Sequence, residues 1–388
     1  LDAYGINALM IKKVVNIITL PLTKIINKCI NDSIFPNVLK LGKVTPVFKK
    51  GDPSNINNFR PITIVPILGK IFEILLKKQM ADYLETNNIF SSSQYGFRNN
   101  LSTTLAVNSL CQHVLNAFEA KCYAFACFFD LTKAFDVVSH NILIEKLNHY
   151  KFGIQSTNML QSYLSNRQQY VCIKNDKSLI KTIEQGVPQG SVLGPILFLI
   201  YINDLPNSTS NQVILFADDT TVIGQHSELT LLESAKNHVT NQISGWFAAN
   251  KLVSNSNKTQ EVIFSLREIN NPTETPAKFL GLLLDRKMTW ESHITQVVKK
   301  LSSKLFLLRE ILTCVSQSAA LTTYHSVVHS VLTYGILIWG HSPHIKKLFA
   351  FQRKCLRLLD HLGYRDDCRP AFIKLKILTL PSVYIFQC

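Results

Sequence analysis

The sequence predicts an α+β protein with a helical C-terminal part, and three observations lead to that class. Apolar segments with strand character, such as 124–129 and 213–223, alternate in the middle of the chain with segments of helical apolar spacing. From Ile294 onward only helical spacing recurs, through Val297, Leu301 and the leucines after them. The chain has 388 residues, of which 46% are hydrophobic and 17% charged, so it can bury a substantial core in several lobes.

Three elements are predicted in the first quarter of the chain. Residues 8–30 show helical spacing, which we expect to be interrupted at Pro21 because proline lacks the backbone N–H that a helix needs. Residues 43–52 form a short strand that runs into a basic turn. Residues 66–85 form a helix. The side chains expected to face inward from this helix are those of Ile71, Ile74, Leu75 and Leu84.

Strands and helices alternate through the middle of the predicted fold. Apolar runs bounded by Gly, Pro or Asp mark the strands, and longer periodic segments mark the helices. In chain order we expect a strand over 124–129, a helix through 142–147, a Gly/Pro loop over 186–190, a buried helix over 194–205, a strand–Asp–Asp–strand hairpin over 213–223, an amphipathic helix over 229–250 and a strand over 279–284.

The charge balance indicates a polyanionic partner. Lys and Arg number 41 against 26 Asp and Glu, which gives a net charge of +15 and suits either nucleic acid or an anionic membrane surface. The longest apolar run, 192–202, contains Gly194 and Pro195 and is shorter than the roughly 20 residues that span a bilayer. No basic segment followed by an apolar one opens the chain. We therefore expect no membrane partner.

The cysteines and the chain ends bear on compartment and completeness. The nine cysteines show no C-x-x-C pair and no zinc-like spacing with histidine, so reduced, mostly buried thiols inside a cell are expected. The chain starts at Leu1 and stops at Cys388 just after an apolar stretch, which we interpret as a fragment of a longer polyprotein.

Two apolar strands that end in bare acids carry the predicted chemistry. Phe128-Phe129 leads into Asp130, and Leu215-Phe216-Ala217 leads into Asp218-Asp219. A carboxylate in apolar surroundings is costly unless a cation compensates it. If the two strands are neighbours, these acids converge into an oxygen-rich site suited to two Mg²⁺ ions. Taken alone, each element is as easily explained as an ordinary turn, because acids tolerate turn geometry.

A glycine-rich loop lies between the two acidic strands in the chain. Residues 185–195 read Gln-Gly-Val-Pro-Gln-Gly-Ser-Val-Leu-Gly-Pro and lead into a predicted helix. Glycines let a backbone approach a ligand closely, and the amide groups that open a helix favour anions. The combination of both acidic strands with this loop, in this order, makes a set of unrelated turns improbable.

These segments resemble the polymerase motifs of reverse transcriptases. Residues 129–136, Phe-Asp-Leu-Thr-Lys-Ala-Phe-Asp, resemble motif A; 186–194 resemble motif B; and 216–219, Phe-Ala-Asp-Asp, resemble motif C. The form of motif A, with His140 after it, and of motif C is typical of non-LTR (LINE-type, jockey-like) retrotransposons. Further similar segments are Phe59-Arg-Pro-Ile62 with Lys70, Gln94-Tyr-Gly-Phe-Arg98, Asn257-Lys-Thr259 as motif D, Phe279-Leu-Gly281 as primer grip, and Tyr334-Gly335, Trp339-Gly340 and Gln352-Arg-Lys354 after the thumb.

The resemblance implies roles for single residues. Asp130 and Asp218 would be metal ligands, with Asp219 as a supporting acid, and the cofactor would be two Mg²⁺ ions, with Mn²⁺ as an alternative. Phe135 falls at the position where an aromatic ring would exclude a ribose 2′-hydroxyl. The residues expected to contact the incoming dNTP are Phe135, Gln189, Gly190, Arg60, Lys70 and Lys258, the last as a proton donor to pyrophosphate.

Basic residues mark an expected nucleic-acid track. From residue 289 onward, 13 Lys and Arg face 5 Asp and Glu, an excess of 13 − 5 = 8, in a helical region that could follow a duplex backbone. A merely soluble helix face is the alternative interpretation. The residues expected to contact nucleic acid are Lys49, Lys50, Arg98, Gly281, Lys299, Lys300 and Lys304.

The implied architecture is a right-hand polymerase with fingers, a palm whose antiparallel sheet is flanked by helices, and a helical thumb. The expected divisions are 1–120 for an N-terminal extension and fingers, 121–150 for the palm with motif A, 151–185 for a connection, 186–285 for the rest of the palm, 286–345 for the thumb and 346–388 for a partial C-terminal region.

The implied function is RNA-directed DNA synthesis from a primer 3′-end, in target-primed reverse transcription. The partners would be an RNA template, a DNA primer or target, dNTPs and an endonuclease domain outside this fragment. The protein would act in a cytoplasmic ribonucleoprotein and in the nucleus.

Two alternatives stay open. One is a group II intron or telomerase-type reverse transcriptase, although a maturase is expected to have a different tail and Tyr in place of Phe216. The other is a catalytically inactive RNA-binding remnant, against which stand the intact acids and the intact loop.

Overall fold

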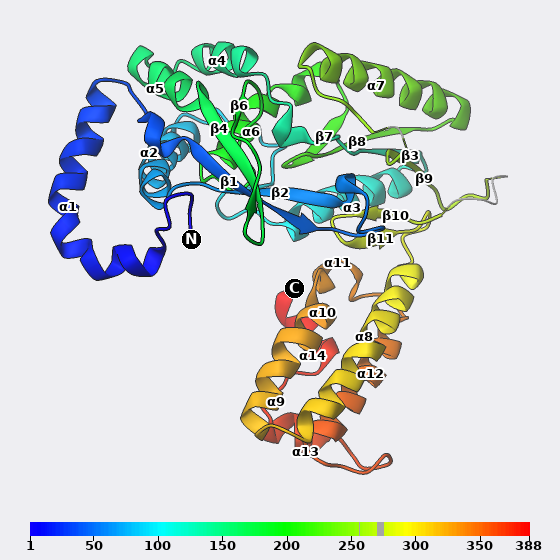
Figure 1. Ribbon diagram of the computed structural model, residues 1–388. Helices are drawn as coiled ribbons and strands as arrows, with labels where there is room; N and C mark the ends of the chain where they lie inside the picture. Colours follow the sequence, from blue (N-terminus) through cyan, green and yellow to red (C-terminus); the bar gives the residue numbers. More distant parts are fainter. Residues whose placement is uncertain (256, 270–274) are drawn as a thin grey trace. The chain divides into compact units, whose positions relative to one another are not determined.

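A computed structural model of the chain describes residues 1–255, 257–269 and 275–388. The contacts divide it into two compact units, each assembled from separate stretches of sequence. The first unit comprises residues 1–101, 129–220 and 237–259, and the second comprises 102–128, 221–236 and 260–388. The helix and strand content confirms the predicted mixed class, with helices throughout and antiparallel strand pairs in the middle of the chain (Figure 1).

The first half of the chain holds six helices and six strands within its described residues. Their bounds are α1 Ala8–Asn31, β1 Leu41–Phe48, β2 Phe59–Ile64, α2 Ile67–Thr86, α3 Thr103–Glu119, β3 Tyr123–Phe129, α4 His140–His149, α5 Ile154–Leu164, β4 Arg167–Ile173, β5 Asp176–Lys177, β6 Lys181–Ile183 and α6 Gly194–Ile202.

The second half begins with the strands that follow motif B and ends in a run of helices. The bounds are β7 Gln212–Phe216, β8 Asp219–His226, α7 Leu229–Ala249, β9 Gln260–Phe264, β10 Ala277–Phe279, β11 Leu282–Leu284, α8 Glu291–Leu312, α9 Gln317–Thr323, a π-helical turn Tyr324–His329, α10 Ser330–Thr333, α11 Ile336–Trp339, α12 Ile345–Leu359, α13 Arg369–Lys374 and α14 Leu380–Gln387.

The strands form two main sheets. One sheet, in the first unit, has the order β2-β1-β4-β5, with β6 also paired to β4. In it β1 pairs antiparallel to β2, Val44 opposite Thr63, and parallel to β4, Val44 opposite Val171. The other sheet has the order β7-β8-β3-β9, and its strand β3 pairs antiparallel to β9 with Ala124 opposite Phe264. The second sheet contains the strands that end at the predicted acids.

The core of the first unit surrounds helix α6. Every side chain from Ile196 to Ile202 in α6 is buried, which follows from a segment that is apolar on all sides. Tyr201 supplies a polar end to this segment, because its hydroxyl donates to the backbone oxygen of Asn250 at 2.5 Å. The helix that follows motif B is therefore fixed deep inside the first unit.

The second unit contains the C-terminal helices, in which α8 and α12 run side by side in the same direction. Glu291 at the start of α8 lies 3.8 Å from Lys347 near the start of α12. Beyond the other end of α8, the amide of Gln317 donates to the backbone oxygen of Leu359, the last residue of α12, at 3.3 Å. Figure 1 shows both helices in this region of the second unit.

Three sequence predictions of local structure are wrong. Helix α1 does not stop at Pro21 but continues through it to Asn31. Figure 1 shows this helix bent, the usual response to an internal proline. The predicted strand over 279–284 is two short strands, because Leu280 and Gly281 adopt positive φ and turn the chain between them. The buried helix predicted over 194–205 ends at Ile202.

The inward face of α2 is also rotated relative to the prediction. Ile74 and Leu75 are 55% and 42% exposed, whereas Phe72, Glu73 and Leu76 are buried. One position along a helix turns the side chain by about 100°, so a one-residue error moves a side chain from the core to the surface. Leu84 is buried as predicted, so the error is confined to the positions around Glu73, whose charged side chain lies on the inward face.

No helix within the described parts of the chain is both long and apolar enough to cross a membrane.

Candidate functional site

The three predicted acids all lie in the first unit and act on one another electrostatically. Asp130 follows the last residue of β3, and Asp218 and Asp219 lie where β7 turns into β8. Burial raises the pKa of Asp218, and the charge of Asp130 raises it further. Asp219 keeps part of its surface in solvent, yet the surrounding protein, followed by the charges of Asp218 and Asp130, raises its pKa to about 6. The two acidic strand ends therefore form one cluster of negative charge.

The turn that carries Asp218 has a strained backbone held by a side chain from elsewhere in the chain. Ala217 adopts φ +56, a left-handed conformation that is uncommon for a residue with a Cβ. Its backbone N–H donates to Oε1 of Gln94 at 3.1 Å, and the N–H of Gly96 donates to the same oxygen at 2.8 Å. The N–H of Tyr95 donates to the oxygen of Leu215 at 2.8 Å. The segment around Gln94 thus continues the hydrogen bonding of β7 up to the acidic turn.

Gly96 has to be a glycine for this arrangement. A Cβ at that position would meet the backbone nitrogen of Ala217 and the carbonyl carbon of Phe216. The side-chain nitrogen of Gln94, Nε2, is buried and has no hydrogen-bond partner among the described residues.

Lys258 contacts Asp130 directly. Its Nζ lies 2.9 Å from Oδ2 of Asp130, and both side chains are partly exposed. The loop before Lys258 is tied to the same residue, since the N–H of Asn255 donates to the backbone oxygen of Asp130 at 2.8 Å. An ammonium group therefore compensates Asp130, whereas Asp218 and Asp219 receive no comparable contact in the hydrogen bonds and ion pairs of the described residues.

The donor set fits divalent cations in type and charge. Carboxylate oxygens are the ligands that Mg²⁺ accepts from proteins, and it needs only one or two of them beside water and phosphate. Beside burial, the charge of Asp130 raises the pKa of Asp218, and the charges of Asp218 and Asp130 raise that of Asp219, which indicates excess negative charge that a cation would relieve. Among the described residues no three His, Cys, Asp or Glu side chains are close enough to form a complete metal cage by themselves.

The motif B loop lies against β2 and the motif A turn. The N–H of Thr63 donates to the backbone oxygen of Gln189 at 2.7 Å. Gly190 has φ +118, and a Cβ there would lie 2.5 Å from the oxygen of Thr63, so only glycine fits. Gln189 was predicted to line the nucleotide site; its side-chain amide donates to both carboxylate oxygens of Asp136, at 2.9 and 3.0 Å. Burial raises the pKa of Asp136, and this amide and Lys133 oppose that rise.

The start of the loop is fixed to motif A as well. The backbone N–H of Gly186 donates to the oxygen of Val138 at 2.8 Å, and that of Val187 to the oxygen of Phe135 at 2.8 Å. His140 Nε2 lies 2.8 Å from the oxygen of Gly186. Motifs A and B are thus joined by backbone contacts on both sides of Asp136.

Phe135 is a half-buried ring that stacks on a core aromatic. Its centroid lies 4.6 Å from that of Phe198 in α6, with an interplanar angle of 28°. Because α6 is rigidly buried, this stacking fixes the position of the Phe135 ring. The packing agrees equally with a core role and with a fixed steric boundary.

Apart from Lys258, the basic residues predicted in the first unit fall into three groups. Arg60 and Lys49 lie near enough to Asp218 for their charges to lower its pKa, in opposition to burial and Asp130. Lys50 is exposed and Lys70 half-buried on α2, and neither has a side-chain contact to the acids in the described residues. Arg98 is engaged elsewhere: it makes two hydrogen bonds to the carboxylate of Glu85, at 3.0 and 2.7 Å. Arg98 thus braces the end of α2.

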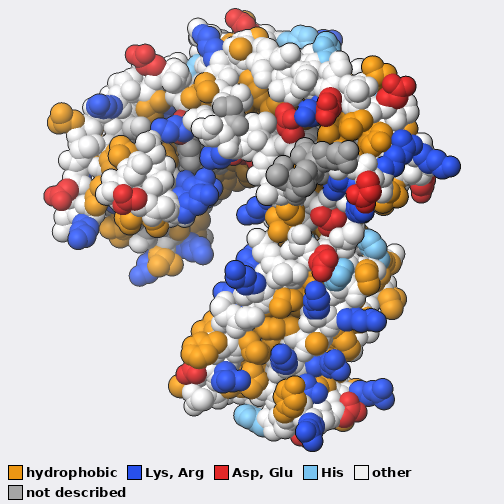
Figure 2. All heavy atoms as spheres, turned by 90° about the vertical axis from the view of Figure 1, so that its right-hand side faces the viewer, with side chains coloured by type: hydrophobic (Ala, Val, Ile, Leu, Met, Phe, Trp, Pro, Cys, Tyr) orange, Lys and Arg blue, Asp and Glu red, His pale blue; other side chains and the backbone are white. Residues whose placement is uncertain are grey.

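The remaining predicted residues lie in the second unit. Gly281 has φ +89, and a Cβ there would lie 3.2 Å from the ring of Tyr334, whose hydroxyl donates to the oxygen of Leu280 at 2.5 Å. Lys299 and Lys300 are exposed on α8, and Lys304 is half-buried. Figure 2 shows Lys and Arg side chains spread over one face of the C-terminal helices.

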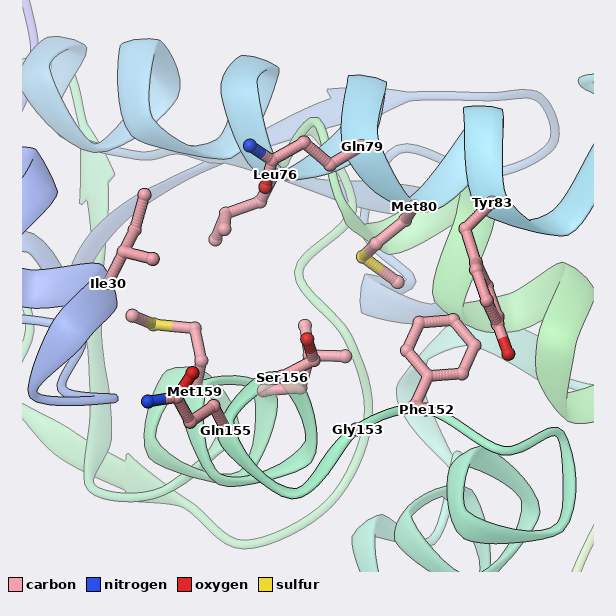
Figure 3. A pocket seen from close by; sticks show the side chains of 11 residues that line it. Ile30, Leu76, Gln79, Met80, Tyr83, Phe152, Gly153, Gln155, Ser156 and Met159 are labelled. Atoms are coloured by element: carbon pink, nitrogen blue, oxygen red, sulfur yellow. The ribbon is translucent and has the colours of Figure 1, made fainter.

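Two hollows in the first unit are large enough for a ligand. A polar one of about 860 Å³ is lined by Asp136, Gln189, Lys133 and Lys181, on the surface of the motif B loop. A smaller apolar one of about 310 Å³ lies between α2 and α5, where Met80, Tyr83 and Phe152 point into it (Figure 3). None of the three acids lines either hollow.

Three residues that support the site were not singled out by the sequence prediction for any role in it. Gln94 and Asp136 fall inside quoted motifs but received no role, and Glu73 lies in a predicted helix of which only Lys70 was assigned to the site. A signal was available for Glu73 alone, since a charged residue among the apolar positions of a predicted buried face requires a partner.

Comparison with known proteins defines the class. The family model described as "Reverse transcriptase (RNA-dependent DNA polymerase)" matches residues 47–284, which include all three motifs, and the chain belongs to this family. Within the family it is similar to the "Probable RNA-directed DNA polymerase from transposon X-element" of Drosophila melanogaster, 30% identical over 359 residues. It is also similar to the "RNA-directed DNA polymerase from mobile element jockey" of the same species, 28% identical over 363 residues. The predicted resemblance to jockey-like non-LTR elements is confirmed.

The matches differ in how much of each chain they cover. The X-element and jockey matches each cover 87% of this chain but only 39% and 40% of those relatives, so this chain spans about two fifths of their length. Among solved structures, telomerase from Candida albicans in complex with a fragment of telomeric RNA aligns over 94% of this chain and 66% of its own. That alignment has a TM-score of 0.48 at 12% identity.

Proposed function

We propose that this chain is the polymerase part of a non-LTR retrotransposon reverse transcriptase, which extends a primer 3′-end on an RNA template with dNTPs. The observation that carries the proposal is the cluster of Asp130, Asp218 and Asp219 at the ends of neighbouring strands, with excess negative charge. Membership of the reverse transcriptase family supports the same chemistry.

Asp130 and Asp218 would hold the two Mg²⁺ ions, with Mn²⁺ as an alternative, and Asp219 would support them. When bound, such a pair of ions activates the attacking hydroxyl and stabilises the leaving pyrophosphate. Gln94 keeps the turn of Asp218 in its strained conformation, because its carbonyl oxygen accepts the N–H of Ala217. The protein's own contribution is thus to fix both carboxylates before substrate arrives.

Other residues would position the nucleotide and its phosphates. Arg60 and Lys49 already act on the acidic cluster and would bind the triphosphate, with Lys70 as a further candidate on α2. The Phe135 ring would set the boundary against a ribose 2′-hydroxyl. Lys258, which lies 2.9 Å from Asp130, would donate a proton to departing pyrophosphate.

The wider assignments are proposals that rest on relatives longer than this chain. Nicked chromosomal DNA would supply the primer, and an endonuclease elsewhere in the full protein would make the nick. The exposed Lys299 and Lys300, with Lys304, would bind the phosphate backbone of the duplex. The protein would act in a cytoplasmic ribonucleoprotein and in the nucleus.

Primer extension on an RNA template with dNTPs and Mg²⁺ tests the proposal. Asp130→Asn and Asp218→Asn should each abolish extension while RNA binding stays the same or becomes slightly tighter, since negative charge is removed. The matched control is Asp176→Asn, which removes one exposed acid from β5. Full activity in either site variant would exclude the metal assignment, and RNA binding without extension by the natural chain would favour an inactive remnant.

A further inference from the structure

A buried carboxylate ties α2 to the end of the motif B loop. Glu73 is 1% exposed. Its Oε2 accepts the backbone N–H of Val192 at 2.5 Å and that of Leu193 at 3.3 Å. Its Oε1 accepts the hydroxyl of Tyr163 at 3.1 Å. Both carboxylate oxygens are thus used, and two of the three donors come from the loop.

The two amides belong to residues that immediately precede α6, which begins at Gly194. N–H groups at the start of a helix have no partner within it, and a negative charge there is favourable. No side chain of the residue before α6 caps the helix. Glu73, about 120 residues earlier in the chain, therefore accepts the two N–H groups just before α6, while the hydroxyl of Ser191 accepts the N–H of Gly194, the first residue of the helix, at 3.0 Å.

A buried arginine, Arg167, lies near Glu73. The Arg167 guanidinium is 2% exposed and lies 4.7 Å from the ring centroid of Tyr163, the same residue that donates to Glu73. Nη1 of Arg167 donates to the backbone oxygen of Tyr163 at 3.3 Å. Burial raises the pKa of Glu73, and the hydrogen bond from Val192 and the charge of Arg167 oppose that rise.

Burying a carboxyl group costs free energy of folding unless hydrogen bonds compensate it. A side chain that only filled space at position 73 of α2 could be a leucine. The presence of an acid at position 73 is explained by its two hydrogen bonds to backbone N–H groups of the loop, which are not paired in a strand ladder.

Several contacts fix the loop before Gly190, and those of Gln189 lie next to that residue. Thr63 in β2 holds the backbone of Gln189, and Asp136 in motif A holds its side chain. Gly190, at the centre of the loop, has no side chain to limit its backbone torsions. The loop conformation therefore depends on the contacts that hold the residues before and after it. Glu73 supplies the anchor after Gly190.

We propose that Glu73 is a positioning residue for the nucleotide site: its buried carboxylate, which accepts the N–H groups of Val192 and Leu193, fixes the motif B loop in the conformation that receives the dNTP. This inference rests on the function proposed above. Loss of the anchor should raise the KM for dNTP more than it lowers kcat, because the acids themselves are held by Gln94 and β3.

The test variant is Glu73→Gln in the full chain, which keeps the shape but removes the charge. A hydrogen bond to a charged group contributes enough that its loss should raise the dNTP KM about 10-fold or more. The matched control is Glu85→Gln, which removes a different acid from the same helix, one that is paired with Arg98 and has no contact with the loop. Tyr163→Phe, which removes one hydrogen bond and keeps the ring, covers the case in which Glu73→Gln does not fold, and should raise the KM less.

Amide hydrogen exchange of residues 187–193, without substrate or metal, gives a readout independent of activity. Glu73→Gln should accelerate exchange there and Glu85→Gln should not; unchanged exchange would overturn the anchor. Faster exchange with an unchanged dNTP KM would overturn the positioning role. A rise in KM matched by equal falls in kcat and in RNA affinity would also overturn it, because it would indicate a general loss of structure. If the natural chain extends no primer, the proposed function fails, while the exchange result still decides whether Glu73 anchors the loop.

Discussion

Protonation of His293 should make the second unit lose stability below pH 6.5. His293 lies in the first turn of α8, is 3% exposed, and packs between Trp290 and Trp339 at centroid distances of 6.4 and 5.8 Å. Nδ1 accepts the N–H of Leu283 at 3.4 Å, while Nε2 has no partner among the described residues. Burial, and then the charge of Lys300, lowers the pKa of His293 from 6.5 to about 4.

The sign follows from which state binds the proton. Between pH 6.5 and 4 the unfolded chain protonates His293 and the folded chain does not, so the free energy of unfolding falls as pH falls. A difference of about 2.5 pKa units corresponds to roughly 3 kcal/mol at most, of which about 2 kcal/mol is lost by pH 5. This is a large share of the roughly 5–15 kcal/mol that stabilises a typical domain.

Urea unfolding at pH 7.5 and 5, followed by tryptophan fluorescence, measures the effect, since two of the three tryptophans flank the ring. His293→Gln keeps an acceptor for the N–H of Leu283 but cannot titrate, so its loss of stability between the two pH values should be smaller by about 2 kcal/mol. His361→Gln, at an exposed position of the same unit, should behave like the natural chain. Equal pH dependence in all three would mean that folded His293 takes up the proton, and would refute the reasoning.

Three substitutions test single contacts of the site. Phe135→Val should loosen discrimination against ribonucleotides, measured as the ratio of kcat/KM for a dNTP and its rNTP; an unchanged ratio would argue against a steric boundary. Gln94→Leu removes the acceptor that holds Ala217 and should lower kcat about 10-fold or more with RNA binding unchanged, and normal extension would show that the turn holds itself. Gly190→Ala places a Cβ 2.5 Å from the oxygen of Thr63 at φ +118 and should destabilise the first unit by about 1–3 kcal/mol, seen as a lower Tm; a natural Tm would mean that the loop can move away.

The placement of the acids at strand ends, and the glycine-rich loop, could be predicted from the sequence because each is recognised from a short stretch of neighbouring residues. A buried strand that ends in a bare carboxylate can be recognised from about eight residues, and Asp130, Asp218 and Asp219 each follow such a strand in the structure. The hairpin over 213–223 and the helices at 66–85 and 229–250 were predicted for the same reason. Their metal-binding roles stay predictions, because nothing in the described contacts decides them.

The contacts that support the acids could not be predicted in the same way. Gln189 meets Asp136 across 53 positions, and Gln94 meets Ala217 across 123. Contacts between residues so far apart in the chain depend on how strands and helices pack together. Hydrophobic periodicity gives no information about that packing. The rotation of α2 illustrates the cost: because Glu73 was not expected in the core, Ile74 and Leu75 were assigned to it instead.

The supporting contacts share one physical cause. The segments that carry the predicted chemistry have irregular backbone, with φ +56 at Ala217 and φ +118 at Gly190, so their N–H groups cannot all be paired within a ladder or a helix. A buried N–H without a partner is costly, and side-chain oxygens of Gln94 and Glu73 accept these groups instead. An acidic site built on irregular turns therefore requires buried polar side chains from distant elements, and these can be located in a structure by tracing which side-chain oxygens accept the N–H groups of the turns.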